Sequence, residues 1–138
     1  MSGPALRQLE AHRSIHQAAN GEAEELLSIV QRLHHDGIRD RALETAHVLI
    51  EHWETRTLRH AESEEEGFYL EKGKKNPHLL ETITKLTRDH DLMRLLVNES
   101  KDILQKDGVN KEVIVRFEAL LLLVEIHSRE EEKYLLSN

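Results

Sequence analysis

The stretch RHAESE, residues 59–64, places His60 and Glu64 four residues apart, the spacing that puts two side chains on one face of an α-helix. On that face they lie about 5–6 Å apart, so an imidazole nitrogen and a carboxylate oxygen can reach one metal ion or two adjacent ions. A single pair of this kind is typical of a solvated charged face. Because the spacing returns at His127 and Glu131, the sequence indicates a site with two matching halves.

The composition of the 138-residue chain predicts one all-α domain over residues 1–138. Hydrophobic residues make up 38% and charged residues 33%, and only two prolines and six glycines interrupt them, which favours helices over strands. The formal net charge is −7 without a basic stripe, so nucleic acid is not an expected partner. Neither a membrane-spanning run nor a signal-peptide pattern is evident, so we expect a cytoplasmic protein that does not associate with membranes.

The chain contains no cysteine. This excludes disulfides, thiolate zinc sites, iron–sulfur clusters and cysteine nucleophiles. Any metal must therefore be held by nitrogen and oxygen ligands.

Apolar residues recur at intervals of three and four in four stretches, as on the buried face of a helix. Asp40, Asn76 and Asn110 are good N-cap residues, and Gly37 and Gly108 can end helices in a left-handed conformation. The glycine-containing residues 67–75 break the pattern and are predicted to form the longest connection. We expect an up-down-up-down four-helix bundle, with helices at approximately 5–36, 40–66, 76–107 and 110–136.

Seven potential metal donors fall on the inward faces of these helices and are predicted to converge at one depth of the bundle. Burying carboxylates without compensation costs several kcal/mol each, and a bound pair of cations removes that cost. The remaining histidines lie off the inward faces and are expected at the surface; they are His34, His35, His47, His52 and His78. The seven donors are His12, His16, His60, Glu64, His90, His127 and Glu131.

This arrangement resembles the hemerythrin family, including its bacterial HHE-type members, four-helix proteins that hold two non-haem irons inside the bundle. The resemblance implies that His60 and His127 are terminal ligands and that Glu64 and Glu131 bridge the irons. It assigns the remaining histidine positions to the first and third helices. The matching segments are Glu10-Ala11-His12 with His16, Arg59-His60 through Glu64-Glu65, Arg88-Asp89-His90-Asp91, and Ile126-His127 through Glu131-Glu132.

Two features depart from the family pattern. The family carries its double histidine on the third helix, whereas here His12 and His16 place the pair on the first. The acid of the fourth helix follows its histidine by four residues instead of five. If only one residue of the pair binds metal, we expect it to be His16.

The resemblance implies a di-iron site that binds dioxygen, or a related small oxidant such as peroxide or nitric oxide, with the three-histidine side saturated. Mixed imidazole and carboxylate ligation fits iron or manganese better than zinc, and the resemblance favours iron. Trp53, Thr57 and Met93 either line the space beside the metal or pack in the core. Because the inward faces supply no obvious additional acid or base, we expect an oxygen- or metal-binding protein more than a dedicated enzyme.

Two alternatives use the same metals. One is a di-iron enzyme, a peroxidase or a nitric-oxide-handling protein. The other is a metal- or oxygen-sensing regulatory module, which would act through a protein partner that the sequence does not identify.

Overall fold

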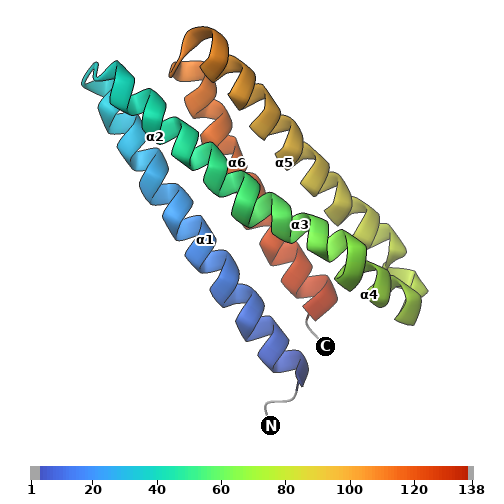
Figure 1. Ribbon diagram of the computed structural model, residues 1–138. Coiled ribbons are helices and arrows are strands. Elements are labelled where there is room, and N and C mark those ends of the chain that lie inside the picture. Colours follow the sequence, from blue (N-terminus) through green and yellow to red (C-terminus); the bar gives the residue numbers. More distant parts are fainter. Residues whose placement is uncertain (1–3, 137–138) are drawn as a thin grey trace.

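The structure is a computed structural model that describes residues 4–136, so the two ends of the predicted domain 1–138 lie outside it. Most of these residues are helical and none lies in a strand, which confirms the all-α prediction. Short turns divide them into four long helical segments (Figure 1). No helix in the described part of the chain combines the length and the apolar character needed to cross a membrane.

Each segment consists of one or more helical elements. The first is α1, Pro4–His35, and the third joins a 3₁₀ turn, Pro77–Leu79, to α5, Leu80–Asp107. The fourth is α6, Lys111–Glu131, followed by a π-helical turn, Glu132–Leu136. The second contains α2 (Arg39–His52), a π-helical turn (Trp53–Leu58), α3 (Arg59–Ser63), a second π-helical turn (Glu64–Phe68) and α4 (Tyr69–Lys75).

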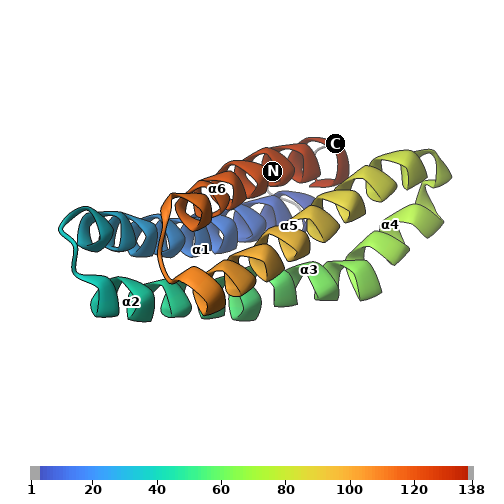
Figure 2. The ribbon, with the colours of Figure 1, turned by 90° about the horizontal axis from the view of Figure 1, so that it is seen from above.

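The second segment corrects the sequence prediction, because residues 67–75 are helical and not a long connection. Gly67 and Gly73 are tolerated inside the helix. A side chain at Gly73 would meet Leu80, so close contact with the start of α5 explains this glycine. Figure 2 shows α4 and the first turns of α5 lying together at one end of the molecule.

The helix ends follow the predictions in part. Gly37 and Gly108 both have φ of +71°, the left-handed conformation expected of them. The Asn110 side chain caps α6 by accepting a hydrogen bond of 2.9 Å from the Val113 N–H. Asp40 is not the N-cap, because the Ile38 carbonyl already accepts a bond from Ala42 and the helix starts at Arg39. Pro77 does open a helical turn, but the Asn76 side chain makes no capping bond.

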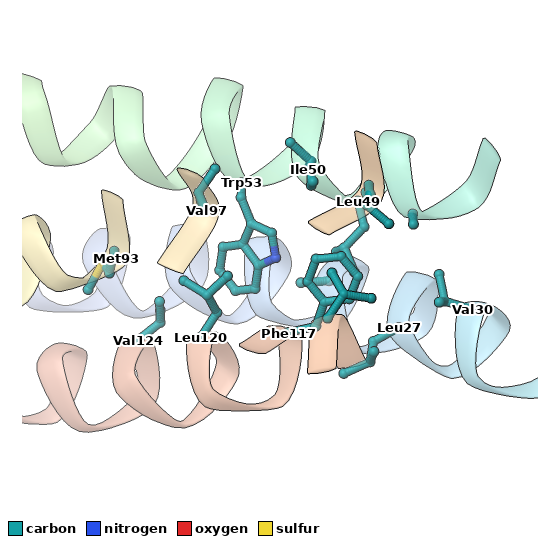
Figure 3. Close-up of a cluster of buried hydrophobic side chains, with 14 residues drawn as sticks. Leu27, Val30, Leu49, Ile50, Trp53, Met93, Val97, Phe117, Leu120 and Val124 are labelled. Atoms are coloured by element: carbon teal, nitrogen blue, oxygen red, sulfur yellow. The ribbon is translucent and has the colours of Figure 1, made fainter. Parts of the chain in front are cut away.

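Successive segments run in opposite directions, so the two described ends lie at the same end of the molecule (Figure 1). α1 packs against α2 and α6, and α5 packs against α6 and α2. Figure 3 shows the largest apolar cluster filling the space between the four segments, with Trp53, Phe117 and Leu120 near its centre. A smaller cluster joins Tyr69, Leu86 and Leu135.

Candidate metal centre

The seven predicted donors come together between the four segments, on the Met93 and Val124 side of the large apolar cluster. Their ligating atoms form two groups, each with its members within 4.8 Å of one another. His12, His16 and His60 make one group, named here the three-histidine half. The other, named the two-histidine half, comprises Glu64, His90, His127 and Glu131.

Glu64 presents one carboxylate oxygen to each half. Its Oε1 lies 3.4 Å from His90 Nε2, and its Oε2 lies 3.5 Å from His60 Nε2 and 3.9 Å from His12 Nε2. Glu64 is 5% exposed, so water cannot provide the usual solvation of its carboxylate.

Glu131 repeats this arrangement from α6. Its Oε1 accepts a hydrogen bond from His12 Nε2, while its Oε2 lies 3.2 Å from His127 Nε2. Glu131 is completely buried. The two acids therefore connect the two halves.

The imidazoles of the two-histidine half are oriented by carboxylates behind them. His90 Nδ1 donates to Glu65 Oε2 at 2.7 Å, and His127 Nδ1 donates to Asp89 Oδ2 at 2.9 Å. Both Nε2 atoms point inward and lie 3.1 Å apart. A proton held on Nδ1 leaves the Nε2 lone pair free, as a metal ligand requires.

The three-histidine half is held less firmly. Ser128 Oγ lies 2.8 Å from His16 Nδ1, and Glu132 Oε2 lies 3.3 Å from His12 Nδ1. The His60 side chain is 34% exposed, whereas His90 and His127 are buried. The Nε2 atoms of His16 and His60 are out of contact with solvent. Neither atom has a hydrogen-bond partner among residues 4–136.

Tyr69 also belongs to the centre, although its position in the sequence predicts that it lies in a connection. Its hydroxyl donates to Glu131 Oε2 and lies 3.4 Å from both His90 Nε2 and His127 Nε2. The Tyr69 N–H donates to the Glu64 carbonyl five residues back, the bond of a π-helical turn. This wide turn brings residues 64 and 69 to the same face, so the five-residue spacing would have pointed to the tyrosine only if the π-helical turn had been known.

The charges of the two acids control protonation of most of the histidines. Burial opposes the charged form of His12, but the hydrogen bond and charge of Glu131 outweigh it and raise the pKa of His12. The pKa of His127 is raised for the same reason, with Asp89 contributing. Glu64 raises the pKa of His60 against the effect of burial. Burial, helped by the neighbouring His12 charge, lowers the pKa of His16 to about 3.

The same interactions also shift the pKa values of the buried Glu131 carboxyl and Tyr69 hydroxyl groups. Burial alone would raise the pKa of Glu131, but hydrogen bonds from His12 and His127 lower it below its ordinary value. Glu131 is therefore an anion at neutral pH. Burial and the nearby carboxylates raise the pKa of the Tyr69 hydroxyl far above 10.

These donors fit a pair of metal cations. Two buried ligating nitrogens, on His16 and His60, lack hydrogen-bond partners within the described residues, and each acid directs one oxygen toward each half. Cations would occupy both groups and compensate the buried carboxylates. The structure thus contains buried His and Glu groups that could hold metal ions, and their chemistry does not identify the metal.

A cavity of about 280 Å³ adjoins the centre. Donors from both halves line it, including His16, His60 and His127, and surface residues such as Arg59 lie along its wall. Thr57 and Met93 also line the cavity, which agrees with the interpretation that they line the space beside the metal. Trp53 does not; it packs in the large apolar cluster.

Of the five histidines expected at the surface, His34, His35, His47 and His78 are exposed. His52 is buried, which corrects the prediction. α1 packs closely against α2 at this point, so His52 Nε2 donates to the Ala19 carbonyl at 2.8 Å and Nδ1 lies 3.3 Å from Glu22. Both ring nitrogens of His52 therefore have partners on α1, and His52 lies outside the two donor groups.

Comparison of the chain with protein-family models, curated proteins and solved structures finds no match. The function must therefore be inferred from the chemistry of the centre itself.

Proposed function

We propose that this protein is an up-down-up-down four-helix bundle of hemerythrin type that holds two non-haem metal ions, iron before manganese or zinc, and binds dioxygen or a related small oxidant such as peroxide or nitric oxide. The observation that carries the proposal is that Glu64 and Glu131 each direct one oxygen to each half. A single ion cannot use both oxygens of two such carboxylates together with five histidines in two separate groups.

Each residue has a defined part in this proposal. His12, His16 and His60 would hold one ion, His90 and His127 the other, and the two acids would bind both. A pair of iron ions, when bound, supplies the electrons and the coordination position that a dioxygen-sized oxidant needs. The chain itself orients the imidazoles through Asp89 and Glu65, and the cavity beside the ligands gives a small molecule access to both halves.

The test is metal analysis after anaerobic iron loading, with an optical spectrum of the reduced protein before and after exposure to air. We expect two irons per chain and a spectral change on oxidation. One iron or fewer would contradict the two-metal proposal, and two irons with an unchanged spectrum would contradict oxidant binding.

One alternative is a di-iron enzyme that consumes peroxide or nitric oxide, because the cavity that adjoins donors of both halves would give a substrate access to the metals. Sustained peroxide consumption by the iron-loaded protein would support the enzyme, whereas stoichiometric binding without turnover would support the carrier.

A further inference from the structure

We propose that Tyr69 is a metal ligand, and that its phenolate oxygen is the fifth protein donor of the two-histidine half. The inference rests on the proposed function, since it requires an ion in that half. It adds a residue that neither the helical pattern of the sequence nor the family resemblance assigns to the centre.

The distances place the phenol among the ligands and not behind them. Neighbouring donors of a six-coordinate ion with bonds of about 2.1 Å lie about 3 Å apart. His90 Nε2 lies 3.1 Å from His127 Nε2 and 3.4 Å from Glu64 Oε1. The Tyr69 oxygen lies 3.4 Å from both histidine nitrogens, on the same scale.

Packing holds the phenol in this position. Tyr69 is 3% exposed, and its ring stacks on the His90 ring with centroids 5.5 Å apart and planes 6° from parallel. Leu86 and Leu135 pack around it. By contrast Asp89 and Glu65, which orient the imidazoles, contact Nδ1 on the outer side of each ring.

The donor count then becomes equal in the two halves. The three-histidine half has three nitrogens and two carboxylate oxygens, and the two-histidine half has two nitrogens, two carboxylate oxygens and the phenolate. As the bond from the phenol oxygen to the metal forms, the O–H bond breaks and one proton leaves to solvent, with no change in oxidation state. Tyrosinate is a known protein ligand of iron.

Tyr69 does not line the cavity, whereas His90 and His127 do. An external ligand that enters through the cavity therefore meets this half without passing the phenol. Of the two half-sites, the phenolate would complete the one that has fewer histidines.

The experiment uses the full chain loaded with ferric iron and resonance Raman spectroscopy in its visible absorption band. The chain has only two tyrosines, and Tyr134 is 46% exposed, which makes Tyr134→Phe the matched control. We expect phenolate ring vibrations in the wild type and in Tyr134→Phe, and their loss in Tyr69→Phe.

Each result of this experiment either supports or overturns the assignment of Tyr69 as a metal ligand. Phenolate vibrations in iron-loaded Tyr134→Phe support the assignment even if Tyr69→Phe fails to fold, because only one tyrosine is then left to produce them. Two bound irons without such vibrations overturn the assignment and leave the proposed function intact, with Tyr69 serving only as a hydrogen-bond donor to Glu131. Vibrations that persist in folded Tyr69→Phe also overturn it. A wild-type chain that binds no iron overturns the proposed function itself.

Discussion

The two halves of the centre hold their histidines by different means. In the two-histidine half both rings are buried, and a carboxylate accepts a hydrogen bond from each Nδ1. In the three-histidine half the nearest partners of Nδ1 are the Ser128 hydroxyl for His16 and, at 3.3 Å, Glu132 for His12. The comparison suggests that the first half is arranged before metal binds, whereas the second adapts as metal binds.

The shared acids should give the largest effect, because they belong to both halves. We expect Glu131→Ala or Glu64→Ala to reduce the metal content of the iron-loaded chain from two ions to less than one. His78→Ala is the control, since His78 is exposed on the turn Pro77–Leu79. Metal analysis after desalting measures the effect. If Glu131→Ala retains two ions, the carboxylates do not connect the halves.

Removing the metal should have the next largest effect. Ions that bind only the folded chain stabilise it by about 4 kcal/mol at a thousandfold excess over Kd. We therefore expect chelation to lower the Tm by on the order of 10 °C. Thermal melts followed by circular dichroism measure this, and superimposable melts with and without chelator would contradict a shared metal cage.

The difference in Tm between holo and apo protein should be smaller at pH 6 than at pH 8. His12, His60 and His127 have raised pKa values in the metal-free fold, so the stability they contribute is present below about 6.5 and is lost as the pH rises through their folded pKa values. His16 opposes them, because its pKa of about 3 makes the fold lose stability as the pH falls below about 6.5. We expect the three raised groups to outweigh His16 between pH 8 and pH 6, because most of the stability loss from His16 falls below this range, between about 6.5 and its folded pKa of about 3.

Protons also compete with metal for the same nitrogens, which narrows the difference further at low pH. Melts at both pH values, with and without chelator, test this. A difference that grows toward pH 6 would show that repulsion among charged histidines exceeds their attraction to the two acids.

Much of the centre was predictable because ligand spacing and helix periodicity coincide. Glu64 and Glu131 each follow a histidine by four residues, which places each pair on one inward face. Tyr69 follows Glu64 by five residues, and a five-residue spacing shares a face only where the turn is π-helical. No local rule identified the π-helical turn at Glu64–Phe68, and Gly67 and Gly73 suggested a break instead.

The carboxylates that accept hydrogen bonds from the ligating histidines show a second limit of prediction from the sequence. Asp89 precedes His90 in the chain, yet it accepts a hydrogen bond from His127 on the neighbouring helix. The helical pattern shows which faces turn inward, but not which carboxylate pairs with which imidazole. His52 illustrates the same limit, because its partner is a backbone carbonyl of α1.

Asp89→Ala should affect one half only. Loss of a partner that orients a ligating histidine typically costs 10–100-fold in metal affinity. We expect the weakening to appear in one of the two stepwise dissociation constants, measured by competition with a chelator. Asp102→Ala is the control, because Asp102 lies on the same helix and is exposed. Equal loss of both ions in Asp89→Ala would show that the halves are not independent.

Ser128→Ala should have the smallest effect. A hydroxyl carries no charge, so its hydrogen bond to His16 fixes the ring less strongly than a carboxylate would. His16 also retains the neighbouring His12 ring, with centroids 4.1 Å apart, to limit its rotation. We expect a loss of metal affinity of less than about tenfold, confined to the dissociation constant that Asp89→Ala leaves unchanged.

Ser14→Ala, an exposed change on the same helix as His16, is the control. If Ser128→Ala costs as much as Asp89→Ala, the three-histidine half is as firmly arranged as the other, and the contrast between the halves fails.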